Sequence, residues 1–93
     1  MTGSKPAVSI SRERVAAVVL ELCHKRGMGK TICPSEAARA LAGPDSDWRE
    51  LMELVRAVGQ ELSVRGQIDV TQRGRVLDLA SVKGPVRFGL PQD

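Results

Sequence analysis

Apolar residues recur at helical spacing near the start of the chain. Ser11 is a good N-cap, and the positions after it follow the three-and-four spacing of one helix face: Val15, Val18, Val19, Leu22 and Cys23. Ile10 precedes the cap and Val15 lies four residues beyond it, which is the arrangement of a hydrophobic staple. Gly27, after two basic residues, ends the pattern. We expect a helix over residues 11–26.

A second helix is predicted from the stretch "CPSEAARALAG" at residues 33–43. Pro34 lies at a first helical position, and Glu36 lies where a capping-box acid belongs. Cys33 is a poor capping residue, so a start at Ser35 is the alternative. Gly43 and the proline after it end this helix.

The clearest periodicity of the chain follows a short turn. Asp47 and Glu50 form a second capping-box pair, and the apolar positions then continue over four turns: Trp48, Leu51, Met52, Val55, Val58, Gly59 and Leu62. We expect a third helix over about residues 47–65, ending at Gly66.

The remaining sequence has the period of strands. "KTI" at residues 30–32 is a short extended segment, and "QIDVTQ" alternates, with Ile68 and Val70 on one side. "QRGR", with Gly74, supplies a turn to "RVLDL", which predicts a β-hairpin. "GPVRFGL" at residues 84–90 places alternate apolar residues on one face. It is either a last strand or an extended arm that packs on the helices.

The order of elements is helix, short strand, helix, turn, helix and hairpin. The second and third helices with their tight turn match a helix-turn-helix, and the hairpin matches a wing. We therefore predict an α+β fold, a winged helix-turn-helix with three helices, a C-terminal β-hairpin wing and a possible final strand. The domain is expected at residues 10–90, between a flexible N-terminus at 1–9 and a tail at 91–93.

The composition of the chain argues against several classes of function. The chain has 93 residues, which suits one small domain, and Trp48 and Phe88 are its only aromatic residues, which argues against stacking of single-stranded bases. The longest apolar run, residues 15–20, is too short for a membrane span, and no signal peptide is recognisable. We expect a cytoplasmic protein without membrane contact. Two cysteines and one histidine are too few for a zinc site, so no metal or other cofactor is expected.

Catalytic motifs are not evident. Gly29-Lys30-Thr31 resembles the end of a phosphate-binding loop, but His24 stands where the first glycine should be, and a helix rather than a strand precedes it. A single histidine supports no Ser/His/Asp arrangement, and we predict that the chain is not an enzyme. The alternative is a reactive Cys33 at a helix start, which would be alkylated selectively near neutral pH.

The charges are distributed unevenly along the chain. The formal net charge is +3, but residues 1–42 contribute +4, residues 43–63 contribute −3 and residues 64–93 contribute +2. The presumed recognition helix is therefore the acidic part. Its expected exposed face carries Arg49, Glu50, Glu53, Arg56 and Gln60. Pairing of the two arginines with Glu53 would neutralise part of the repulsion from phosphates.

The basic residues that are left free lie at the wing. Arg73 and Arg75 at its tip suit phosphate or minor-groove contact, with Arg65, Lys83 and Arg87 nearby in sequence. The leading hypothesis is a module that binds double-stranded DNA through Arg73 and Arg75, supported by Arg49 and Arg56. The alternative is a protein-interaction module that uses the acidic third helix or the C-terminal strand. Neither hypothesis fixes the oligomeric state.

Four stretches together resemble a known family. "TICPSEAARAL", "DWRELMELVRAV", "GQIDVTQRGRVLD" and "KGPVRFGL" are similar, in this order and spacing, to a bacterial family of small uncharacterised domains, the domain-of-unknown-function family 3253. The resemblance covers about residues 11–90. It implies a winged-helix-like fold and no established activity, and it assigns no catalytic residues. Some relatives carry a cysteine-rich segment ahead of the domain. This sequence has none, so no metal role is implied.

Overall fold

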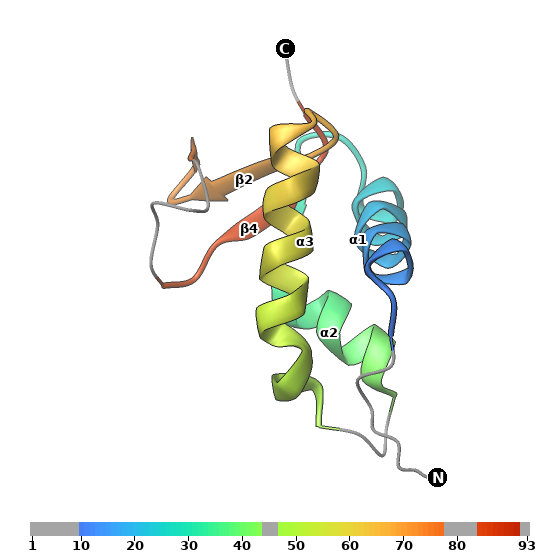
Figure 1. The fold of residues 1–93 in the computed structure, drawn as a ribbon. Coiled ribbons are helices and arrows are strands. Elements are labelled where there is room, and N and C mark those ends of the chain that lie inside the picture. Colours follow the sequence, from blue (N-terminus) through green and yellow to red (C-terminus); the bar gives the residue numbers. More distant parts are fainter. Residues whose placement is uncertain (1–9, 44–46, 78–83, 92–93) are drawn as a thin grey trace, which may run out of the picture.

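The helices precede most of the strands along the chain in the computed structural model, which describes residues 10–43, 47–77 and 84–91. Within these ranges the helices are α1 (Arg12–Arg26), α2 (Pro34–Ala42) and α3 (Met52–Val64), and a 3₁₀ turn, η1 (Trp48–Leu51), leads into α3. The strands are β1 (Thr31–Ile32), β2 (Asp69–Gln72), β3 (Arg75–Val76) and β4 (Arg87–Gly89) (Figure 1). The predicted flexible N-terminus, the turn at 44–46 and Lys83 lie outside the described residues.

The helix ends follow the local signals of the sequence. The hydroxyl of Ser11 accepts a hydrogen bond of 3.1 Å from the Arg14 amide and so caps α1. The Cys33 amide donates to the Glu36 carboxylate at 2.9 Å. Cys33 is therefore the N-cap of α2, and the helix does not start at Ser35. The predicted bounds of these two helices are confirmed.

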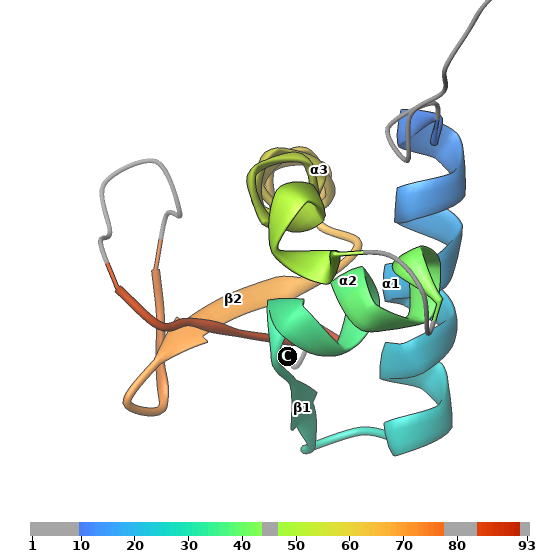
Figure 2. The ribbon, with the colours of Figure 1, turned by 90° about the horizontal axis from the view of Figure 1, so that it is seen from below.

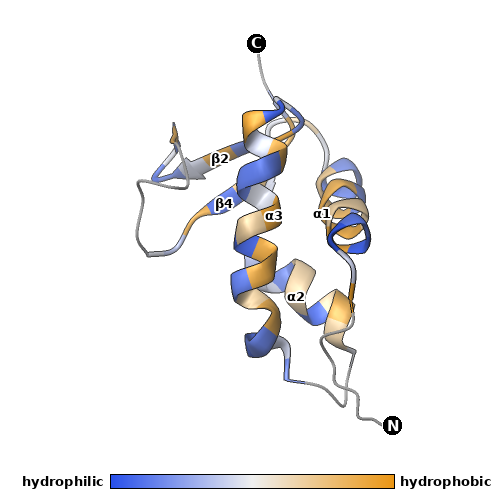
Figure 3. Ribbon diagram, in the orientation of Figure 1, coloured by the Kyte–Doolittle hydropathy of each residue, from blue (hydrophilic) through white to orange (hydrophobic). Residues whose placement is uncertain are grey.

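The third helix begins later than its periodicity suggested. The carboxylate of Asp47 accepts from the Arg49 amide at 3.0 Å and caps η1, so the first turn is 3₁₀ and the α-helix starts at Met52. Tight 3₁₀ turns are common at helix N-termini. On α3 apolar and hydrophilic positions alternate, as in a helix with one face in the core (Figure 3). None of the described helices is long and apolar enough to cross a membrane.

The described strands form one antiparallel sheet with the order β1-β4-β2-β3. The last strand in sequence, β4, lies between β1 and β2, so the possible final strand is confirmed and is central rather than peripheral. The predicted hairpin is present as β2 and β3, but β3 has two residues and forms the edge. Three helices with this sheet make the fold α+β, in an arrangement compatible with a winged helix.

The core is centred on one aromatic side chain. Phe88 on β4 is fully buried and lies opposite Ile32 on β1 and Val70 on β2, so these three side chains form one row toward the helices. Gly59 of α3 lies directly above the ring. A Cβ atom at Gly59 would come within 2.4 Å of Phe88 Cζ, so only glycine permits this approach of helix to sheet.

We expect Gly59→Ala to destabilise the fold. Overpacking costs about 1–3 kcal/mol, which outweighs the gain in helix propensity of about 1 kcal/mol. Urea denaturation should therefore show a lower free energy of unfolding. Phe88→Leu provides the control, because a smaller side chain leaves room for the added methyl group. In the Gly59→Ala background Phe88→Leu should cost less than in the wild type. Strictly additive losses would contradict this account of Gly59.

Candidate nucleic-acid interface

The turn between β2 and β3 carries two of the predicted site residues. Gln72 pairs with Arg75, and Arg73 and Gly74 are the two residues of the turn between them, with φ angles of 55° and 82°. Two consecutive residues with positive φ are typical of a type I′ turn, which favours asparagine and glycine. An L-residue with a side chain such as Arg73 pays about 1–2 kcal/mol for this conformation. Arg73 therefore occupies a turn position whose backbone conformation is unfavourable for arginine.

The sheet has one face in the core and one face that no described helix covers (Figure 2). Successive strand residues point to opposite faces, so the neighbours of the buried row point outward. Thr71 of β2 lies opposite Arg87 of β4. The buried Ile32 of β1 is flanked by Thr31 and by Cys33, the residue that follows this strand. We call this surface the open sheet face: Thr31, Cys33, Asp69, Thr71, Arg87 and Gly89.

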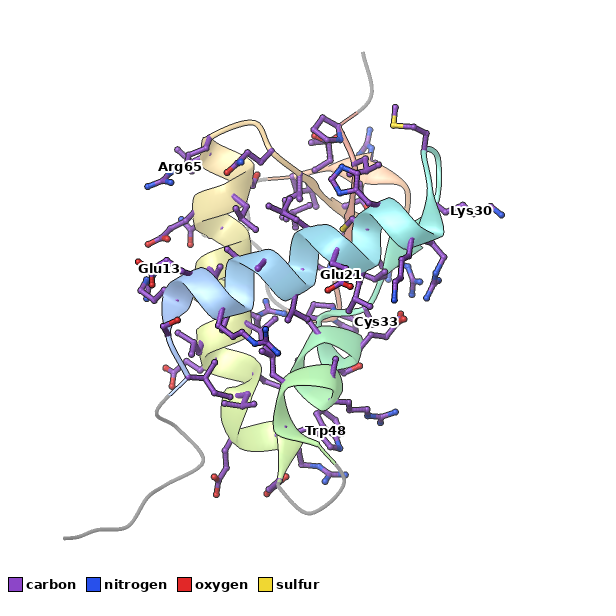
Figure 4. The ribbon with its side chains drawn as sticks, turned by 90° about the vertical axis from the view of Figure 1, so that its right-hand side faces the viewer. Glu13, Glu21, Lys30, Cys33, Trp48 and Arg65 are labelled. Carbon is purple, nitrogen blue, oxygen red and sulfur yellow. The ribbon has the colours of Figure 1, made fainter. Side chains whose placement is uncertain are left out.

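Two hollows lie side by side on the open sheet face. One has a volume of about 710 Å³, and its lining includes Cys33, Arg73 and Arg87. The other has a volume of about 410 Å³, and its lining includes Lys30 and Asp69. Both include Thr71, which therefore stands at their boundary. Lys30 projects outward from the loop between α1 and β1 (Figure 4).

Arg87 links β4 to β1 on the open sheet face. Its guanidinium donates to the hydroxyl and the carbonyl of Thr31, the latter at 3.2 Å, and lies 3.0 Å from the Cys33 sulfur. Arg26 donates to the same Thr31 carbonyl at 3.0 Å and forms an ion pair with Glu36. A guanidinium has five N–H donors, so the exposed Arg87 keeps donors for a ligand after these contacts are made.

The other two predicted arginines are engaged elsewhere. Arg49 lies 3.8 Å from the Asp47 carboxylate, and its guanidinium stacks on Trp48 at 4.6 Å, with Arg39 also stacked on this indole at 4.5 Å. Arg56 is half-buried and donates to the Gly84 carbonyl at 3.3 Å. Neither arginine forms the expected ion pair with Glu53 among the described residues.

The predicted residues do not form a single surface. The β2–β3 turn, which carries Arg73, lies on the side of the sheet away from α3 (Figure 2), whereas Arg49 and Arg56 belong to η1 and α3. Within the turn, Arg75 pairs with Gln72 whereas Val76 pairs with Thr71, so Arg75 is on the opposite face of the ribbon from Thr71.

Arg73 has basic neighbours that the sequence did not assign to the site. Arg87 was noted only as near the wing, and Lys30 was considered only in the rejected phosphate-loop motif. The alternation of Val86, Arg87 and Phe88 was a signal for the outward position of Arg87. It became usable only once β4 was known to be a central strand.

The two cysteines differ in environment. Cys33 is partly exposed at the start of α2, whereas Cys23 is fully buried in α1. Burial raises the pKa of the Cys23 thiol above its ordinary value; nearby Arg26 lowers it and Glu36 raises it, both to a smaller extent. Among the described residues no three His, Cys, Asp or Glu side chains gather as a metal site.

We expect iodoacetamide to alkylate Cys33 in the native protein well before Cys23. The thiolate is the reacting form, and Cys23 is both shielded and harder to ionise. Mass spectrometry of timed digests would give the two rates, with urea-unfolded protein as the control in which both thiols react. Equal native rates would contradict the burial of Cys23.

We expect Arg73→Asn to stabilise the fold by about 0.5–1 kcal/mol, because asparagine tolerates a positive φ and suits a type I′ turn. Urea denaturation measures the change. Arg75→Gln is the control, since it removes the same charge from a residue in extended conformation and should leave the stability nearly unchanged. A loss of stability in Arg73→Asn would show that the Arg73 side chain stabilises the turn.

The comparison with known proteins agrees with the resemblance seen in the sequence. A family model described as "Protein of unknown function (DUF3253)" matches residues 12–91. No curated protein matches the chain. Because the match spans the helices and every described strand, the chain belongs to the DUF3253 family.

Proposed function

We propose that this domain binds double-stranded DNA by contacting phosphates through Arg73 and Arg75. The supporting observation is the turn itself: two exposed arginines flank Gly74, neither forms an ion pair among the described residues, and one is held in an unfavourable backbone conformation. Strained positions of this kind often have a functional reason. Exposed guanidinium groups suit bidentate binding of phosphate.

Phosphate contact is favoured over base readout by α3. The outer residues of this helix and of η1 include Glu50 and Glu53, which are exposed and form no ion pair among the described residues. Carboxylates at these positions would repel phosphates on both sides of a groove. Arg56 supports the proposal indirectly, because its bond to the Gly84 carbonyl holds the chain ahead of β4. Arg49 adds positive charge on η1. Phosphate contacts of this kind position a protein on DNA without specifying sequence.

The test is fluorescence anisotropy of a labelled mixed-sequence duplex, titrated at several salt concentrations. We expect Arg73→Asn/Arg75→Gln to bind about tenfold more weakly at low salt, with a slope of log affinity against log salt reduced by about two, since each lost phosphate contact removes about 0.9. Arg14→Gln/Lys25→Gln is the matched control. It removes two charges from α1, on the other side of the molecule from the turn (Figure 1).

Two results would contradict the proposal. Equal weakening in both double variants would mean that only net charge matters. Absence of binding by the wild type at low salt would exclude DNA as the ligand. It would favour the second candidate function, a protein-interaction module in which the exposed Glu50 and Glu53 face a basic partner.

A further inference from the structure

We infer that the DNA contact extends from Arg73 over the open sheet face to Lys30, so that the duplex lies along the sheet and α3 faces away from it. This inference rests on the proposed function and adds to it a surface, an orientation and further contact residues, Lys30 and Arg87. Arg75, on the other face of the edge strand β3, would contact the duplex from the edge of the sheet. The helix that the sequence suggested for base readout would then have no part in binding.

The two hollows of this surface adjoin at Thr71. Arg73 and Arg87 line the larger one, Lys30 lines the smaller one, and Thr71 belongs to both. Three basic side chains are therefore spread over this surface. Arg73 lies at the β2–β3 turn, Arg87 lies opposite Thr71 on β4, and Lys30 lies in the loop before β1. A phosphodiester strand carries negative charges at regular intervals. It therefore matches several spread basic side chains better than a single small anion does.

The side chains of the open sheet face suit contacts with the DNA backbone. Thr31 and Thr71 carry hydroxyl groups, which bind phosphate and sugar oxygens together with arginine and lysine. The described residues of the face include no aromatic side chain, so it offers no platform for unstacked bases. The acidic residue of the face, Asp69, already interacts with another residue.

The two sides of the molecule differ in their balance of charges. Asp47, Glu50 and Glu53 are exposed on or next to η1 and α3, and the positive charges of Arg49 and Arg56 only offset them there. Around the open sheet face, Lys30, Arg73 and Arg87 outnumber the carboxylate of Asp69. This excess of positive charge favours the orientation with the sheet toward DNA.

Charge reversal at Lys30 tests the extension. Lys30 is exposed and forms no ion pair among the described residues, so Lys30→Glu should fold normally. In the anisotropy titration we expect it to bind about tenfold more weakly than the wild type. Lys25→Glu, the same change on α1, should weaken binding less than threefold. Arg87→Gln should also weaken binding, provided that its urea denaturation shows a folded protein, since Arg87 joins β1 and β4.

A second variant reports the orientation. Glu50→Gln/Glu53→Gln removes two negative charges from the acidic side, and with the sheet toward DNA it should raise the affinity less than threefold. A rise of tenfold or more would place α3 against the DNA and overturn the inference. Equal affinities of Lys30→Glu and Lys25→Glu would overturn it as well. The proposed function would still stand in that case if the turn variant binds weakly. If the wild type does not bind at all, both fail.

Cys33 offers a footprint in the unaltered protein. Its thiol lines the larger hollow beside Arg87. A saturating amount of the mixed-sequence duplex at low salt should slow alkylation of Cys33 by iodoacetamide at least fivefold, and high salt should restore the rate. An unchanged rate in the bound protein would show that DNA does not cover the open sheet face.

Discussion

The contact between Phe88 and Gly59 determines how the sheet meets the helices. The strand that carries Phe88 comes last in the sequence but lies in the middle of the sheet, with Ile32 on one side and Val70 on the other. The ring fits under α3 only because residue 59 has no side chain. With Phe88 fixed inward, the pleat directs Arg87 outward. The chemistry of the open sheet face therefore follows from a packing constraint on its buried side.

The sequence predicted well those features that depend on neighbours along the chain. The caps at Ser11 and Glu36, the proline at the start of α2 and the glycine after α1 are interactions over three or four residues, and the structure has them at the expected positions. The place of β4 depends on pairing with β1, more than fifty residues earlier, which no local pattern specifies. The predicted second hairpin strand, "RVLDL", is observed as Arg75–Val76, and its residues from 78 on lie outside the described part of the chain.

The candidate site shows the same limit. Arg73 and Arg75 were found because a glycine turn between two alternating segments is a local signal. Their separation from Arg49 and Arg56 is tertiary, as are the stacking of Arg49 on Trp48 and the bond of Arg56 to Gly84. Helical periodicity could indicate that these two side chains face away from the core. Helical periodicity could not indicate that both side chains already interact with neighbouring groups.

The charge pattern gains its meaning from this geometry. Along the sequence, an acidic third helix between basic segments looks like a contradiction within a DNA-binding fold. In space Glu50 and Glu53 lie on η1 and α3, whereas Lys30, Arg73 and Arg87 line the hollows of the open sheet face. The contradiction disappears if the sheet, rather than α3, is the binding side. The backbone of Arg73 agrees with this interpretation. A cost of about 1–2 kcal/mol is tolerable within a stability of about 5–15 kcal/mol. An asparagine would avoid that cost, but it would leave the larger hollow without one of its two guanidinium groups.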